Sequence, residues 1–172
     1  MVEIRVYAMM VAGAIPMAVF WSVLTVLVIG MVALLLWKGV RTGARYVSVL
    51  ALVEWIFLVI CATVIFRGTN AERGIRLIPF GSYFDYGEHS YLMEKVALNI
   101  LNLALFIPIG FLLGCGFRNM TWKRALAIGA MFSVFIELLQ LISRRGLCEV
   151  DDVMHNVVGC MIGYGVVRLL SL

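Results

Sequence analysis

The sequence predicts an all-α membrane protein: a single domain over residues 1–172, built as a bundle of about five transmembrane helices. Two observations support this fold class. The chain is 63% hydrophobic and 14% charged, with a mean hydropathy of +1.03, whereas a soluble domain is about half apolar and about one quarter charged. The apolar residues also form runs of the roughly 20 residues that a helix needs to cross a bilayer.

Five apolar runs define the expected helices in chain order. The first lies in the uncharged stretch between Arg5 and Lys38, and we place its span at Ile15–Trp37, around Pro16. A cleavable signal peptide is the alternative for this stretch, but its apolar region is too long for one. The second span is expected at Tyr46–Phe66. The first two spans, within residues 1–66, are expected to support the rest of the bundle. The last three spans are expected at Val96–Phe117, Arg124–Ile142 and Val153–Leu170.

The connections between the spans predict an orientation. The turns after the first and third spans carry basic residues and no acid, whereas the opposite face, with the long polar connection Arg67–Lys95, mixes acids and bases. Because basic residues favour the cytoplasmic side, we expect the N-terminus outside and the C-terminus in the cytoplasm. The basic residues of the two turns are Lys38, Arg41, Arg45, Arg118, Lys123 and Arg124.

Polar side chains occur in the last three spans at one common depth. Ionisable and amide groups are costly within a bilayer and normally face the bundle interior. These groups lie at the start of the third span, the end of the fourth and the start of the fifth, which share one membrane face. Beyond Asn156, Gly159 and Gly163 form a GxxxG step that lets another helix approach closely. The polar residues are Asn99, Asn102, Glu137, Gln140, Asp151, Asp152, His155 and Asn156.

Two interpretations of these residues remain open. In the structural one, Glu137 is paired with Arg76, Arg144 or Arg145 and the amides hold helices together by hydrogen bonds. In the functional one, the residues line a pocket that opens to one membrane face. Glu54 lies apart, in the second span, and is interpreted as a snorkelling or paired acid.

Four sequence blocks follow one another between residues 76 and 164. They are Arg76-Leu-Ile-Pro-Phe80, then Asn99-Ile-Leu-Asn102 with Phe106-Ile-Pro-Ile-Gly110, then Glu137-Leu-Leu-Gln140, and finally Arg145 to Asn156 followed by Gly159 and Gly163. In order and spacing they resemble the VanZ-like family. The resemblance implies a multi-pass protein of the bacterial plasma membrane, associated with resistance to the glycopeptide antibiotic teicoplanin. It implies no particular reaction, because the activity of the family is not settled.

The expected function is binding without chemistry, at the outer leaflet. The ligand would be a lipid head group, a lipid-linked cell-wall precursor or a glycopeptide antibiotic. Arg76 and Arg145 would engage phosphate or carboxylate through paired hydrogen bonds. The expected binding residues are Arg76, Asn99, Asn102, Glu137, Gln140, Arg145, Asp151, Asp152 and Asn156.

Other functions are weighed against this one. A lipid-modifying enzyme would use Glu137 or Asp152 as a general base, with His155 as a third candidate and a divalent metal as a variant. A structural protein would dock a partner through Arg67–Lys95. Transport fits poorly, because the chain has no internal repeat. We recognise no cofactor motif, no metal-ligand spacing and no basic cluster for nucleic acid, so we expect no cofactor, no resident metal and no nucleic acid.

Overall fold

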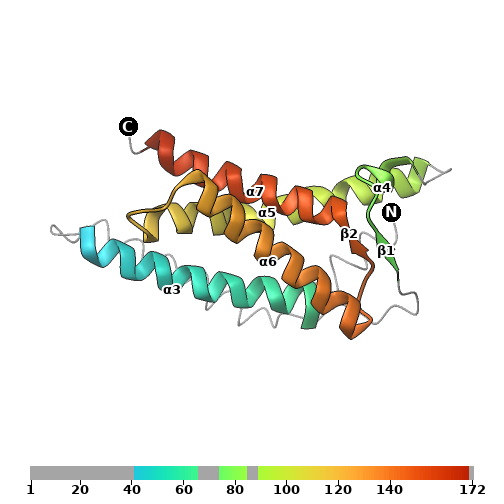
Figure 1. Cartoon of the computed structure of the whole chain (residues 1–172), viewed down its shortest axis with the longest axis horizontal. Helices are drawn as coiled ribbons and strands as arrows, with labels where there is room; N and C mark the ends of the chain where they lie inside the picture. Colours follow the sequence, from blue (N-terminus) through green and yellow to red (C-terminus); the bar gives the residue numbers. More distant parts are fainter. Residues whose placement is uncertain (1–40, 66–73, 85–88, 171–172) are drawn as a thin grey trace.

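The computed structural model describes residues 41–65, 74–84 and 89–170, and four long helices dominate them (Figure 1). By length and composition, each of the four can cross a membrane, over 45–65, 95–116, 122–143 and 150–170. Four of the expected spans are thereby confirmed as helices, while the expected span Ile15–Trp37 lies outside the described residues. The helices are α3 (Arg41–Ile60), which continues as the π-helix η1 (Cys61–Ile65), α5 (His89–Gly116), α6 (Trp122–Ser143) and α7 (Val150–Leu170).

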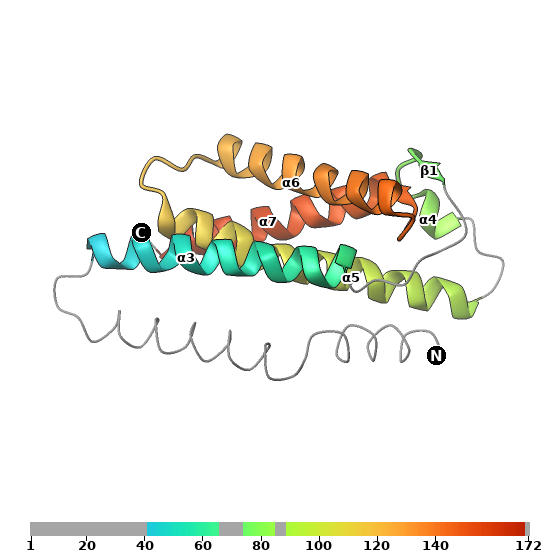
Figure 2. The ribbon, with the colours of Figure 1, turned by 90° about the horizontal axis from the view of Figure 1, so that it is seen from below.

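Helices α5 and α7 form the centre of the bundle. They run in the same direction, because Gly159 of α7 touches Leu103 of α5 and Gly163, one turn later, touches Ile107. Helix α3 packs on α5, and α6 packs on α7, so the two flank the central pair (Figure 2). The start of α5, the end of α6 and the start of α7 therefore lie at one end of the bundle, as the sequence predicts; we call it the polar end.

Glycine permits the close contact between the central helices. A Cβ atom at Gly159 would lie 2.1 Å from the carbonyl oxygen of Leu103, and one at Gly163 would lie 1.9 Å from that of Ile107. From the other side, a Cβ at Gly110 would lie 1.7 Å from the carbonyl oxygen of Cys160. No side chain fits at these distances. The predicted role of the GxxxG step is confirmed, and its partner is α5.

All four long helices begin earlier than the apolar runs suggest, and two of these starts concern the polar end. Helix α5 begins at His89 rather than Val96, and α7 begins at Val150 rather than Val153. Hydropathy locates the membrane boundary, whereas a helix continues until its backbone is interrupted. In α7 the first turn carries Asp151 and Asp152, and acidic residues there interact favourably with the helix dipole.

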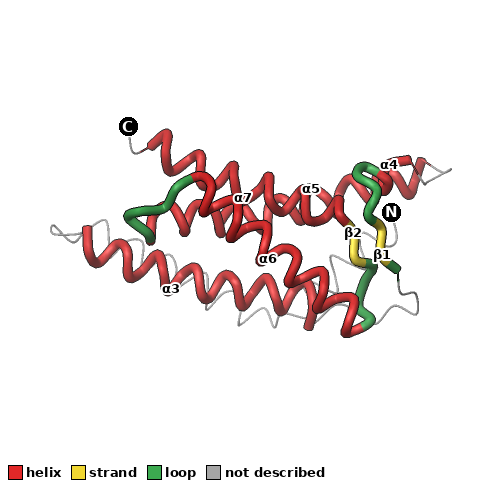
Figure 3. The backbone as a smooth tube through the Cα atoms, in the orientation of Figure 1, coloured by secondary structure: helices red, strands yellow, loops and turns green. Residues whose placement is uncertain are grey.

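The described part of the connection between α3 and α5, residues 74–84, contains regular secondary structure. It contains the strand β1 (Ile75–Arg76) and the short helix α4 (Gly81–Phe84). Strand β1 pairs in parallel with β2 (Cys148–Glu149), so that Arg76 lies beside Glu149 (Figure 3). This small sheet brings the first and last of the four sequence blocks together at the polar end.

Candidate functional site

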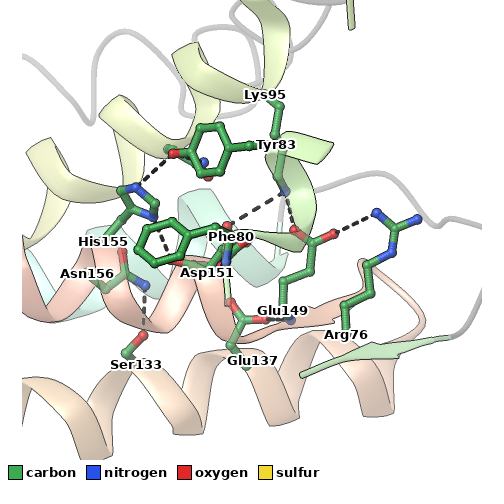
Figure 4. A network of polar contacts seen from close by, with 12 residues as sticks. Arg76, Phe80, Tyr83, Lys95, Ser133, Glu137, Glu149, Asp151, His155 and Asn156 are labelled. Carbon is green, nitrogen blue, oxygen red and sulfur yellow. Dashed lines mark hydrogen bonds and ion pairs between the residues drawn. The ribbon is translucent and has the colours of Figure 1, made fainter. Parts of the chain in front are cut away.

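The polar end contains a cluster of buried polar side chains from α5, α6, β2 and α7 (Figure 4). Helix α5 contributes Asn99, and α6 contributes Ser133 and Glu137. Their burial between apolar helices means that each needs a polar partner inside the protein. The buried members are Asn99, Ser133, Glu137, Glu149, Asp151, Asp152 and Asn156, each no more than 7% exposed.

Ion pairs join β1, α5 and α7 at the edge of this cluster. Lys95 Nζ donates to Oε2 of Glu149, and the same nitrogen lies 3.8 Å from Oδ1 of Asp152. Arg76 approaches the other oxygen of Glu149, at 3.8 Å. Its side chain is 40% exposed, against 6% for Glu149. Arg76 therefore stands at the rim of the cluster, and Glu149 beneath it.

A chain of hydrogen bonds connects α7, α4 and α5. The carbonyl oxygen of Asp151 can only accept, so Nδ1 of His155, 2.6 Å away, carries the proton. In the neutral imidazole, Nε2 then accepts from the Tyr83 hydroxyl at 2.9 Å. The Tyr83 oxygen accepts in turn from Nδ2 of Asn99 at 2.7 Å. Each donor is assigned by its neighbour, and the Asn99 amide is fixed in one orientation.

The carboxylate of Asp151 holds the loop between β1 and α4. Its Oδ1 accepts from the backbone N–H of Phe80 at 2.6 Å. Phe80 has a φ of 61°, in the left-handed region that non-glycine residues seldom adopt. This hydrogen bond helps to maintain the strained conformation. Asp151 thus positions a loop with its side chain and His155 with its backbone.

Glu137 and Asn156 connect α6 to the β2–α7 segment. Oε2 of Glu137 accepts from the backbone N–H of Glu149 at 3.0 Å. Nδ2 of Asn156 donates to the hydroxyl oxygen of Ser133 at 2.8 Å. Glu137 therefore fixes the chain where it enters α7, which is a structural role.

Gln140 and Arg145 lie on another side of α6, against η1. Nε2 of Gln140 donates to the carbonyl oxygen of Thr63 at 2.9 Å, and Arg145 donates to that of Val64 at 3.1 Å and to that of Ile65. A helix end leaves carbonyl groups without intrahelical partners, and these two side chains supply donors to them. In these contacts Gln140 and Arg145 face η1, whereas Glu137, one turn before Gln140 in α6, faces β2. Asn102 is half-buried one turn beyond Asn99.

Two amide oxygens inside the cluster have no hydrogen-bond partner in the part of the chain that the structure describes: Oδ1 of Asn99 and Oδ1 of Asn156. Their side chains belong to residues only 1% and 4% exposed. Leaving a buried acceptor unsatisfied costs about 1–3 kcal/mol, so such atoms normally meet a water molecule or a ligand. In both residues the amide nitrogen is already used.

Two observations concern the residues that metal or thiol chemistry would use. Across residues 41–65, 74–84 and 89–170, no group of three or more His, Cys, Asp or Glu side chains is placed to hold a metal ion. Burial raises the pKa of the Cys148 thiol above its ordinary value, and the carboxylates of Glu137, Asp152 and Glu149 raise it further. A thiol with a raised pKa is a poor nucleophile at neutral pH.

Three members of the site escape the sequence reasoning. Tyr83 lies in the long connection, where no helical spacing relates it to His155, and Lys95 was assigned to the end of that connection. Glu149 was part of the last sequence block but was not selected as a binding residue. The earlier start of α5 is the signal for Lys95, because it places Lys95 one turn before Asn99. For Tyr83 only the folded structure shows the contact.

Fold and site together define a helical membrane protein with a buried polar cluster at one end of its bundle. The chain belongs to the VanZ/LLP1 family, whose model matches residues 46–171. It is similar to Protein VanZ of Enterococcus faecium, with 28% identity over 92 residues that cover 54% of this chain and 51% of that protein. The chain thus spans about half the length of this curated relative. No solved structure matches the chain.

Proposed function

We propose that this protein binds, without chemistry, the polar head group of a membrane-embedded ligand in the cluster at its polar end. The observation that supports the proposal is the pair of buried amide oxygens on Asn99 and Asn156 for which the described part of the chain supplies no donor. They lie within a bundle whose apolar surface contacts lipid, below a half-exposed cation, Arg76. A ligand with an acyl chain in the bilayer would present its head group at this depth.

The candidate ligands are a phospholipid, a lipid-linked cell-wall precursor and a glycopeptide antibiotic that carries an acyl chain. The resemblance to the VanZ-like family supports the last of these, through its association with teicoplanin resistance. It also supports a location in the bacterial plasma membrane. Basic residues at the opposite end of the bundle, among them Arg45, Lys123 and Arg168, favour that end as cytoplasmic, which would put the cluster at the outer leaflet.

Native mass spectrometry of the purified protein tests this proposal. We expect a lipid to co-purify with the wild type and to be lost from Asp152→Ala, because this change removes a buried carboxylate beside Lys95. Glu54→Ala is the matched control, since it removes a half-buried acid from α3, away from the cluster. Lipid retained equally by both variants, with both folded, would contradict the proposal.

A further inference from the structure

Two buried oxygens in the cluster lack a partner among the described residues. They are amide oxygens, which only accept hydrogen bonds, and they belong to Asn99 on α5 and Asn156 on α7. Oδ1 of Asp152, by contrast, faces Nζ of Lys95 at 3.8 Å. Both residues lie on the same side of the contact between Leu103 and Gly159, where the backbones of the two helices touch. In Figure 4 the Asn156 amide directs its nitrogen to Ser133 and its oxygen away from it, toward the side of His155.

The hydrogen-bond network prevents the Asn99 amide from reversing. Its nitrogen donates to the Tyr83 oxygen, because the Tyr83 proton is directed to His155. With a neutral imidazole, that direction follows from the Asp151 carbonyl group, which requires the proton on Nδ1 of His155 and leaves Nε2 as the acceptor. Rotation of the Asn99 amide would bring its oxygen against an oxygen that has no proton to give. Tyr83 is therefore a positioning residue that keeps an acceptor exposed to the interior of the cluster.

The two cations at the edge of the cluster, Lys95 and Arg76, already face carboxylates. Lys95 donates to Glu149 and lies 3.8 Å from Asp152, and Arg76 lies 3.8 Å from Glu149. A phosphate group would have to displace Glu149 from these cations, and its oxygens would meet the amide oxygens without a proton between them. An acceptor-only head group is therefore a poor fit to this part of the cluster.

From these contacts we infer that the ligand is a lipid whose head group donates hydrogen bonds, through ammonium or hydroxyl hydrogens, to Asn99 and Asn156. The inference rests on the proposed head-group binding and specifies its chemistry. A donor from the ligand to each amide oxygen completes the hydrogen bonding of both residues. The phosphate of such a lipid would remain near the rim, on the side of the half-exposed Arg76.

A series of lipids with identical acyl chains tests the inference. Phosphatidylethanolamine loses an N–H donor with each methyl group added, and phosphatidylcholine has none, while the charge of the head group stays the same. We expect binding, measured by native mass spectrometry, to weaken along the series by about tenfold overall, which corresponds to about 1.4 kcal/mol, the size of one hydrogen bond to a buried acceptor. Phosphatidylglycerol compared with phosphatidylmethanol, which has the same single negative charge and no hydroxyl group, provides the same test for hydroxyl donors.

The variant Tyr83→Phe examines how the preference arises. It removes the acceptor for the Asn99 nitrogen and allows the amide to turn, so the preference for ethanolamine over choline should shrink toward equality while lipid still binds. Tyr164→Phe makes the same chemical change at the opposite end, where the hydroxyl donates to the Met120 carbonyl oxygen, and should retain the wild-type preference.

The outcomes separate the two proposals. If the wild type binds none of these lipids, the proposed head-group binding fails. If it binds them without any donor preference in either lipid pair, head-group binding stands and the inference is wrong, because water then satisfies the two oxygens. A preference that persists unchanged in Tyr83→Phe would also overturn the assigned role of the network.

Discussion

Asp151 serves two neighbours with two different groups. Its carboxylate accepts from the backbone N–H of Phe80, and its carbonyl oxygen accepts from Nδ1 of His155. Both contacts act on the segment that carries Tyr83, so one residue couples the loop between β1 and α4 to the interior of the cluster. Replacing Asp151 would disturb both the loop and the position of His155. Asp151 is therefore a poor position for a variant that tests ligand binding alone.

The strained backbone at Phe80 gives a prediction that isolates conformation from side-chain loss. Phe80→Gly and Phe80→Ala remove the same ring, but only glycine adopts a φ of 61° without penalty. Thermal unfolding should show Phe80→Gly to be more stable than Phe80→Ala by about 1 kcal/mol. At Ile142, exposed within α6, the same pair should rank in the opposite order, because alanine favours a helix. Equal stability of the Phe80 pair would show that the loop does not hold this conformation.

At the scale of elements, the contact between α5 and α7 determines the depth of the cluster. Gly163→Ala would place a Cβ 1.9 Å from the Ile107 carbonyl oxygen, and neither helix backbone can move without separating the pair. We expect a loss of about 1–3 kcal/mol in the free energy of unfolding, measured by denaturant titration in detergent.

The control for this prediction lies two residues further along α7. A Cβ at Gly165 would meet nothing within 4 Å. Gly165→Ala should therefore be neutral or slightly stabilising, since alanine has the higher helix propensity. A similar loss in both variants would mean that the effect comes from the helix itself and not from the contact with α5.

The elements illustrate what sequence reasoning can and cannot reach. Apolar runs located four spans, and the spacing of Gly159 and Gly163 predicted a close helix contact, because both signals are local. The hydrogen bonds from Gln140 and Arg145 to η1 were not predictable from spacing, because Thr63 and Val64 are distant in sequence. Their backbone carbonyl groups accept these bonds, and every residue type has such a group. Sequence spacing therefore brought the polar residues to one end of the bundle but did not identify these backbone partners of Gln140 and Arg145.

At the scale of the whole molecule, the two ends of the bundle differ in chemistry. The polar end gathers carboxylates, amides and His155, whereas the opposite end carries Arg168, which donates to Tyr164 and to the carbonyl oxygen of Met120. Parallel packing of α5 with α7 enforces this asymmetry, because it puts both helix starts at the same end. A ligand in one leaflet would therefore meet different protein side chains from a ligand in the other leaflet.

Thiol labelling tests which end faces outward. Cys148 lies at the polar end and is half-buried. In a variant that keeps Cys148 as its single cysteine, we expect a membrane-impermeant thiol reagent to label whole cells. A second variant, which keeps only Cys115 within α5, should stay unlabelled. Because burial and nearby carboxylates raise the pKa of the Cys148 thiol, less thiolate is present at a given pH. Its labelling rate should keep rising with pH beyond about 8.5, where an ordinary thiol begins to level off.

Burial alone can prevent labelling, so the opposite end needs an exposed probe of its own. Asn119→Cys places a thiol in the exposed turn between α5 and α6. With the polar end outside, this cysteine reacts only after the cells are permeabilised, whereas Cys148 reacts before. The reverse pattern would place the polar cluster at the inner leaflet. It would also exclude glycopeptide antibiotics as ligands, because they act from outside the cell. The proposed lipid with a hydrogen-bond-donating head group would remain, because it depends on the contacts of Asn99 and Asn156 and not on the leaflet.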